Sequence, residues 1–285
     1  MADKHLYRQR RIGYDEPMHD HTLICCDIDG TLLGPTRTIS VRTKRAIAAL
    51  VRSGITFALV SGRNAQSLAS IQKELSLTGA MGCFNGALSL DEQNRVIDER
   101  PIDYHVARSV LDELARTELE FFLYTNQRWY VQSHNRWHDD EVSYSGIAGT
   151  IEPLCELEHH LDGSEKPFKF LAMHRDPSYI IEMTATLRQH FQGTLDIFNF
   201  HPNYIELLPP HTDKGRSVLA FKAHYHIEKD RVIAIGDYYN DIAMFQAAGM
   251  AVAMGNAPAD VQAHAHHITL SNSEDGLARF LESLV

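Results

Sequence analysis

The chain of 285 residues is long enough to bury a sizeable core and to form two domains. Its 44% hydrophobic and 22% charged residues are typical of a folded globular protein, and no apolar run reaches the length of a membrane span. A formal net charge of −10 argues against nucleic acid as a partner, because a phosphate backbone needs a basic surface.

Residues 1–20 are polar and lack an apolar stretch, which predicts a loosely ordered extension and no secretory signal.

The first strand is expected over residues 23–26, where consecutive apolar residues favour burial on both faces, as in a parallel sheet. Asp27 and Asp29 follow this run, at the strand end where ligands bind in such sheets. Gly30 then permits a sharp turn. We expect the carboxylates of Asp27 and Asp29 to point in opposite directions, so that one faces a substrate and the other acts from the flank.

Two other interpretations of this motif are an EF-hand loop and a capped turn. An EF-hand loop fails, because Thr31 and the two leucines after it stand where that loop needs an oxygen ligand and a glycine. Taken alone, the motif fits a strand followed by a polar, capped turn equally well. The rest of the chain favours the ligand site.

The next segment alternates helices and strands. In chain order we expect a helix capped by Ser40 and ended by Gly54, a strand over 55–60, a helix over 65–75 and a short strand over 80–84. This alternation predicts a parallel sheet with right-handed crossovers.

From residue 88 the expected elements pair with their sequence neighbours. They are a hairpin over 87–90 and 95–99, a helix over 104–117, strands over 120–125 and 128–133, a strand over 169–174, a helix over 177–191 and a hairpin over 194–200 and 204–208, with residues 134–165 polar and poorly periodic. The pattern predicts an α+β domain over 88–207, inserted into a first domain formed by 21–87 and 208–285. The insert holds 10 Lys and Arg against 21 Asp and Glu, so it carries the acidity of the chain.

The α/β pattern resumes at Lys214. The expected elements are a helix over 215–224, a strand over 231–235, a short helix over 240–249, strands over 250–254 and 268–270, and a final helix with Ser273 as its N-cap.

Cysteine and histidine are not expected to bind metal. The four cysteines lack metal-ligand spacing, and the 17 histidines form no His-Glu-x-x-His or comparable pattern. Cys25 and Cys26 are expected in the core, and cysteine usage favours a reducing, cytoplasmic setting.

Polar clusters fall at several strand ends or helix starts. They are Asp27 with Asp29, Ser61-Gly62-Arg63, Lys214-Gly215, and Gly236-Asp237 with Asn240-Asp241. In neighbouring parallel strands these clusters meet in one crevice. Clustered carboxylates need a cation, and an all-oxygen ligand set favours Mg²⁺. The lysine and the serine hydroxyl add positive charge and donors for an anion. The arrangement is expected to hold a phosphate, with Asp27 as nucleophile and Asp29 as general acid and base.

In order, these four motifs resemble those of the haloacid dehalogenase superfamily of phosphatases. The insert, Asn85-Gly86-Ala87 and the tail over 252–257 are similar to the Cof-type sugar-phosphatase branch, which has a large α/β cap (type IIB). The resemblance spans residues 23–285 and implies an α/β fold: a Rossmann-like core with a parallel sheet, plus an inserted α+β cap domain.

The resemblance also implies roles for the site residues. It makes Asp27 the nucleophile, Asp29 the general acid and base, and Ser61, Lys214 and Asn240 the phosphate contacts. It assigns Mg²⁺ to Asp27, the backbone carbonyl of Asp29, Asp237 and Asp241, and it makes Gly62, Arg63 and Asn85 candidate substrate contacts.

The implied function is a Mg²⁺-dependent phosphatase that acts on a small phosphorylated metabolite through an aspartyl-phosphate. A sugar phosphomutase and a non-catalytic binding protein are the alternatives. Cap residues able to face the site, for each of which packing is the favoured role, are Arg128, Trp129, Arg136, Trp137, His138, Lys169, His201 and Asn203. Tyr238 is expected either to pack under the cap or to stack on a substrate.

Overall fold

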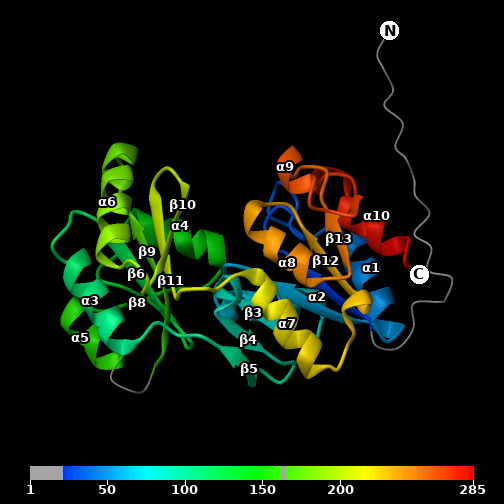
Figure 1. Ribbon diagram of the computed structural model, residues 1–285, viewed down its shortest axis with the longest axis horizontal. Helices are drawn as coiled ribbons and strands as arrows, with labels where there is room; N and C mark the ends of the chain where they lie inside the picture. Colours follow the sequence, from blue (N-terminus) through cyan, green and yellow to red (C-terminus); the bar gives the residue numbers. More distant parts are fainter. Residues whose placement is uncertain (1–21, 162–164) are drawn as a thin grey trace, which may run out of the picture.

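The computed structural model describes residues 22–161 and 165–285, so the extension expected over 1–20 lies outside the described residues. Two units lie side by side (Figure 1). One contains an eight-stranded sheet built from both ends of the described chain, and the other contains a six-stranded sheet built from its middle. This organisation confirms the predicted α/β core with an inserted α+β unit.

The eight-stranded sheet has the order β14-β13-β12-β1-β2-β3-β4-β5. Its strands are β1 (Leu23–Cys26), β2 (Thr56–Val60), β3 (Met81–Cys83), β4 (Leu88–Leu90), β5 (Val96–Glu99), β12 (Val232–Gly236), β13 (Met250–Ala253) and β14 (His267–Ile268). From β14 to β3 the neighbours run parallel, and β4 and β5 add an antiparallel hairpin at the edge.

Both faces of this sheet are covered by helices, as the consecutive apolar residues of β1 predict. Leu23 and Cys25 pack on one face with α7 (Lys214–His224), α8 (Ile242–Ala247) and α9 (Ala259–Gln262). Ile24 and Cys26 pack on the other face with α1 (Val41–Arg52), α2 (Ala65–Leu75) and α10 (Gly276–Glu282). Ser40 caps α1 as expected, because its side chain accepts a hydrogen bond from the backbone of Thr43.

The six-stranded sheet has the order β10-β11-β9-β6-β7-β8. Its strands are β6 (Glu120–Thr125), β7 (Trp129–Val131), β8 (Thr150–Ile151), β9 (Pro167–Met173), β10 (Asp196–His201) and β11 (Tyr204–Leu208). One face packs against α3 (Tyr104–Leu114), α5 (Leu154–His160) and α6 (Pro177–His190). Side chains of the other face, including Phe122 and Leu171, belong to the same apolar cluster as α1 and α2 of the first unit.

Sheet membership corrects the expected start of the insert at residue 88. The hairpin of β4 and β5 is present, but β4 pairs with the exposed edge of β3, so both strands belong to the eight-stranded sheet. The chain that builds the second sheet therefore leaves the first one after Glu99 and returns after Leu208. Local pairing identified the hairpin correctly but could not reveal which sheet edge would accept it.

Two further expectations differ from the structure. The stretch 134–165 contains a helix, α4 (Arg136–Ser145), which Asn135 caps and the left-handed Gly146 ends. Only a few of its residues are buried, so the apolar periodicity was too weak to predict it. Ser273 does not cap the last helix, because its hydroxyl pairs with Ser271 while α10 begins after Asp275. In the described part of the chain, no helix combines the length and apolar character needed to cross a bilayer.

Candidate active site

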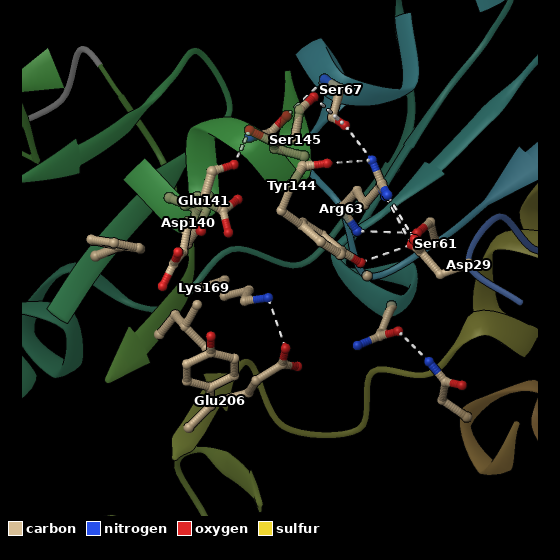
Figure 2. Close-up of a pocket in the computed structure, with 18 of the residues that line it drawn as sticks. Asp29, Ser61, Arg63, Ser67, Asp140, Glu141, Tyr144, Ser145, Lys169 and Glu206 are labelled. Atoms are coloured by element: carbon tan, nitrogen blue, oxygen red, sulfur yellow. Dashed lines mark hydrogen bonds and ion pairs between the residues drawn. The ribbon is translucent and has the colours of Figure 1, made fainter. Parts of the chain in front are cut away.

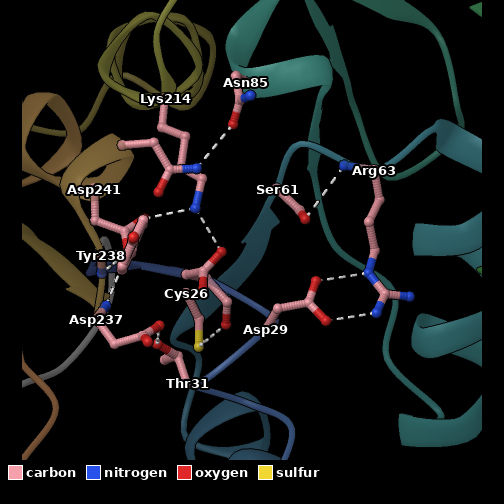
Figure 3. Close-up of polar contacts among 12 residues, drawn as sticks. Cys26, Asp29, Thr31, Ser61, Arg63, Asn85, Lys214, Asp237, Tyr238 and Asp241 are labelled. Atoms are coloured by element: carbon pink, nitrogen blue, oxygen red, sulfur yellow. Dashed lines mark hydrogen bonds and ion pairs between the residues drawn. The ribbon is translucent and has the colours of Figure 1, made fainter. Parts of the chain in front are cut away.

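The site forms where three parallel strands end (Figure 3). Asp27 directly follows β1, Ser61 follows β2, and Asp237 follows β12, and β1 pairs with both of the other strands. Lys214 is the first residue of α7, a helix that packs on one face of this sheet, and it lines the same cavity as these residues. All four residues line one cavity of about 600 Å³, so the structure brings together the clusters that the sequence predicted to converge.

Lys214 lies at the centre of the acidic groups. Its Nζ is 2.5 Å from Oδ1 of Asp27 and 2.6 Å from Oδ1 of Asp241, and all three side chains are buried. Burial alone would lower the pKa of Lys214, but the charges of Asp241 and Asp27 outweigh it and raise that pKa. Burial raises the pKa of Asp27 well above its usual value, although Lys214 opposes the shift. One ammonium group therefore pairs with two buried carboxylates.

Asp237 completes the acidic cluster. Carboxylate oxygens of Asp27, Asp237 and Asp241 lie within 4.8 Å of one another. Burial, followed by the charge of Asp241, raises the pKa of Asp237 to about 6. The hydroxyl of Thr31 donates to Oδ1 of Asp237 at 2.9 Å, and the amide of Asn256 donates to its Oδ2 at 3.1 Å.

This donor set fits a hard divalent cation. It consists of oxygen atoms, and its three clustered carboxylates share the single ammonium of Lys214. Both features favour Mg²⁺. Asp241 is already held by Lys214 through one oxygen and by the backbone N–H groups of Asp237 and Tyr238 through the other. Its bonding suits a residue that steadies the site, and it leaves Asp27 and Asp237 as the carboxylates best placed to contact an ion.

Gly30 is required by this geometry. Its φ of +85° lies in the left-handed region, and a Cβ on it would lie 2.2 Å from Oδ2 of Asp237. Only glycine lets the turn after Asp29 pass so close to the second carboxylate.

Asp29 points away from the acidic cluster, as expected, because β1 ends at Cys26 and Asp29 lies in the turn that follows it. The guanidinium of Arg63 forms a two-point ion pair with it, with Nη2 2.6 Å from Oδ1 and Nε 2.8 Å from Oδ2. The hydroxyl of Tyr144 donates to the same Oδ2 at 2.8 Å, and Arg37 lies 3.9 Å from Oδ1. Burial would raise the pKa of Asp29, but these donors and charges lower it overall.

The remaining predicted residues lie on the cavity wall. Ser61 is buried, and its hydroxyl accepts a hydrogen bond from the backbone N–H of Arg63 at 3.3 Å. Asn240 donates an amide hydrogen to Oδ1 of Asn85 at 3.1 Å, and both residues line the cavity. A Cβ on Gly62 would lie 3.2 Å from the Asn85 amide, so these residues pack tightly together.

Of the eight cap residues named from the sequence, Trp137 and Lys169 line the cavity and the other six do not. The indole of Trp129 donates to the carbonyl of Ile147 inside the cap, and the amide of Asn203 donates to the backbone of His174. Tyr238 also lines the cavity and is 43% exposed.

The sequence analysis missed several lining residues of the cap. They are Phe122, Tyr124, Asp140, Glu141, Tyr144, Ser145, Leu171, Met173, Tyr204 and Glu206. Figure 2 labels Asp140, Glu141, Tyr144, Ser145 and Glu206 among them. Six of them alternate along β6, β9 and β11, so the period-2 pattern of these strands marked the face that they share. No comparable signal identifies Arg37, which comes from a loop of the first unit.

A family model and curated relatives match this chain over most of its length. A family model described as haloacid dehalogenase-like hydrolase matches residues 24–281. A putative phosphatase of Haemophilus influenzae is 32% identical over 260 residues, which cover 90% of this chain and 95% of that protein. A pyridoxal phosphate phosphatase of Escherichia coli is 25% identical, with 92% and 97% covered.

Solved structures agree with this. A haloacid dehalogenase-like hydrolase from Bacteroides thetaiotaomicron superposes with a TM-score of 0.84 at 28% identity, covering 93% of this chain and 100% of that one. A subclass IIB sugar phosphatase of the same superfamily has the same fold, with a TM-score of 0.75 at 19% identity, again covering 93% and 100%.

Proposed function

The chain belongs to the haloacid dehalogenase-like hydrolases, and from that premise we propose that it is a Mg²⁺-dependent phosphatase of small organic phosphomonoesters. The observation that carries this proposal is the set of four groups at the strand ends. A buried carboxylate, a lysine, a hydroxyl and a second carboxylate face one cavity. They supply a nucleophile, charge neutralisation and phosphate contacts, which are what phosphoryl transfer needs.

Asp27, Asp237 and the backbone carbonyl of Asp29 would hold the ion, with Asp241 steadying them, and the bound ion would neutralise charge on the transferring group. Asp27 attacks phosphorus through a carboxylate oxygen, and the bond to the leaving oxygen breaks, which gives an aspartyl-phosphate. Lys214 and Ser61 hold the phosphate oxygens. Asn240 has a second amide hydrogen beyond the one given to Asn85, and it is available to the phosphate.

Asp29 carries out the proton transfers. The pairing with Arg63 favours the ionised carboxylate, which as a base takes a proton from the water that hydrolyses the aspartyl-phosphate. To act as an acid toward the leaving alkoxide, Asp29 must first take up a proton from solvent when substrate binds. Arg63 fixes its carboxylate on the side opposite the acidic cluster. Gly62 lets the chain pass close to Asn85, and Arg63 and Asn85 border the space for the leaving group.

The cap end of the cavity indicates the class of leaving group. Each cation that lines the cavity already has an anionic or carbonyl partner: Lys214 with Asp27 and Asp241, Arg63 with Asp29, Arg37 with the carbonyl of Tyr144, and Lys169 with Glu206 at 2.9 Å. Asp140 and Glu141 add further acidic groups to the same wall. A second phosphate or a carboxylate on the substrate would therefore be repelled.

We infer a leaving group that is uncharged or cationic and has an apolar face. Aromatic side chains of Phe122, Tyr124, Trp137 and Tyr204 line the cap end and can stack on a sugar or on a heteroaromatic ring. Relatives named as phosphatases of pyridoxal phosphate and of a ribitylaminouracil phosphate support a leaving group that bears a ring.

We also propose a cytoplasmic location for the protein. Its cysteines are free, three of them are buried, and free thiols fit a reducing compartment.

The test is release of inorganic phosphate from sugar phosphates, nucleotides, flavin mononucleotide and pyridoxal phosphate, with Mg²⁺ and with EDTA. We expect metal-dependent release from monophosphates, loss of turnover in Asp27→Asn, and wild-type rates in Asp98→Asn, whose carboxylate pairs with Arg216 outside the cavity. Full activity of Asp27→Asn would refute the nucleophile assignment. Turnover that depends on an added sugar bisphosphate would instead indicate a mutase.

A further inference from the structure

Tyr144 is a cap residue that touches the proposed acid and base. It lies in the last turn of α4, and its hydroxyl donates to Oδ2 of Asp29 across the cavity at 2.8 Å (Figure 2). Asp29 comes from the loop after β1, so this hydrogen bond joins the two units at the reacting centre. The function proposed above does not require it.

The same tyrosine is where α4 docks on the first unit. Its backbone carbonyl accepts hydrogen bonds from Nη2 of Arg37 at 3.0 Å and from Nη1 of Arg63 at 3.3 Å. The two guanidinium groups also lie 4.0 and 4.3 Å from the centre of its ring. Cations are favoured at the negative C-terminal end of a helix and over an aromatic face, so each contact stabilises docking of the cap.

Arg63 contacts both Asp29 and the C-terminal end of α4. Two of its nitrogens hold Asp29, while Nη1 donates to the hydroxyl of Ser67 and to the carbonyl of Tyr144. The Ser67 hydroxyl in turn donates to the carbonyl of Ser145 at 3.1 Å. Arg63 is buried, so its guanidinium cannot turn toward solvent without breaking these bonds. The orientation of Asp29 and the position of α4 therefore depend on the same side chains.

We propose that Tyr144 is a positioning residue that couples docking of the cap to the orientation of the Asp29 carboxylate. When α4 is docked, Arg63 and Tyr144 together fix both oxygens of Asp29. When the cap moves away, the hydroxyl of Tyr144 leaves with it, and the carboxylate keeps its partners in the first unit, Arg63 and the more distant Arg37. A leaving group that prevents docking then meets an acid that is not held in place, so the coupling also selects substrates.

Coupling between cap docking and the orientation of Asp29 is reciprocal. This property distinguishes it from a contact in which Tyr144 only packs against the first unit. If docking orders Asp29, then Asp29 must stabilise docking by the same free energy. Replacing Asp29 should therefore loosen the cap even in the absence of substrate. If Tyr144 supported docking only through its ring and its carbonyl, which contact Arg37 and Arg63, docking would not depend on the hydroxyl or on the carboxylate that it contacts.

Tryptophan emission can report docking. The chain has two tryptophans, both in the cap, and Trp137 in α4 lines the cavity while only 7% exposed. In substrate-free protein we expect Asp29→Ala and Tyr144→Phe to shift the emission to the red relative to the wild type. Tyr179→Phe, which removes a cap hydroxyl that bonds the backbone of Glu118 away from the cavity, should leave it unchanged. Wild-type emission from Asp29→Ala would overturn the coupling.

Kinetics provide the second readout, and this part rests on the proposed function. Tyr144→Phe keeps the ring and the carbonyl for both arginines and loses only the hydroxyl. We expect kcat to fall by about 10-fold or more, the effect of one hydrogen bond to a charged group, with a smaller change in KM. A kcat within about 2-fold of the wild type would refute the positioning role. If the wild-type enzyme releases no phosphate at all, the proposed function fails, and the emission data still decide the coupling.

Discussion

Replacing Lys214, the buried lysine at the centre of the site, should destabilise the protein strongly. Bound Mg²⁺ should make this loss of stability smaller. Lys214→Met keeps the length of the side chain but leaves Asp27 and Asp241 without the ammonium that lies 2.5 and 2.6 Å from them. Both carboxylates are buried, at 4% and 0% exposure, so water cannot replace it. Breaking a buried ion pair by removing one partner costs about 3–5 kcal/mol, and here one cation serves two anions.

Such a loss is measurable by thermal unfolding in EDTA. For a chain of this size it corresponds to a fall of about 10 °C in melting temperature. The fall should be larger at pH 8 than at pH 5, because protonation of the carboxylates at low pH relieves their repulsion. Mg²⁺ should reduce it by supplying positive charge. Adding Asp241→Asn to the variant should restore part of the stability, since it removes one of the unpaired charges.

The matched control is Lys44→Met, which removes an exposed ion pair with Glu74 and should cost less than about 1 kcal/mol. A Lys214→Met protein that melts in EDTA within about 2 °C of the wild type would refute this electrostatic account of the site.

Four further predictions concern the pH dependence of metal binding and of stability, the turn at Gly30, and the cysteines. Mg²⁺ affinity, measured by titration calorimetry, should rise as the pH rises through about 6, because the ion must displace a proton from Asp237; an affinity that is flat from pH 5 to 7 would contradict this. In the metal-free protein, between about pH 4 and 6, Asp237 is protonated to a greater extent in the folded state than in the unfolded state. Its contribution to the free energy of unfolding is therefore lost as the pH rises through that window. Gly30→Ala should abolish metal-dependent stabilisation in a melting assay, since its Cβ would overlap the Asp237 carboxylate. A thiol reagent should modify one cysteine, Cys155, in the native protein and four in denaturant, because the other three are buried; rapid reaction of a second native thiol would refute the core packing.

The first unit and its acidic cluster could be predicted from the sequence because each step depends on local order. Leu23 to Cys26 are apolar without alternation, so the strand had to be covered on both faces, and Asp27 had to lie at its carboxyl end. Asp237 and Ser61 follow two other such strands, and parallel strands place their ends at one edge. The roles of these residues stay proposals, but their convergence needed no information beyond the order of the chain.

Contacts between the two units could not be predicted in this way. The bond from Tyr144 to Asp29 joins residues 115 positions apart, and it exists only because a polar helix docks at a particular place. Arg37 contributes from a loop with no periodicity. The start of the insert was misplaced for the same reason, because the edge that accepts a hairpin is decided by tertiary packing.

The cap end of the cavity depends on sheet register, which explains both why it was missed and how it can vary. Phe122 of β6 lies opposite Leu171 of β9, and Leu171 lies opposite Glu206 of β11, so three strands separated in the sequence form one row across the wall. A slip of one residue in any strand would turn its contribution to the other face. Substitutions that preserve register change the wall without moving the proposed catalytic groups, which are positioned by the other sheet. The division lets leaving-group recognition change independently of phosphoryl transfer, provided that α4 still docks through Tyr144.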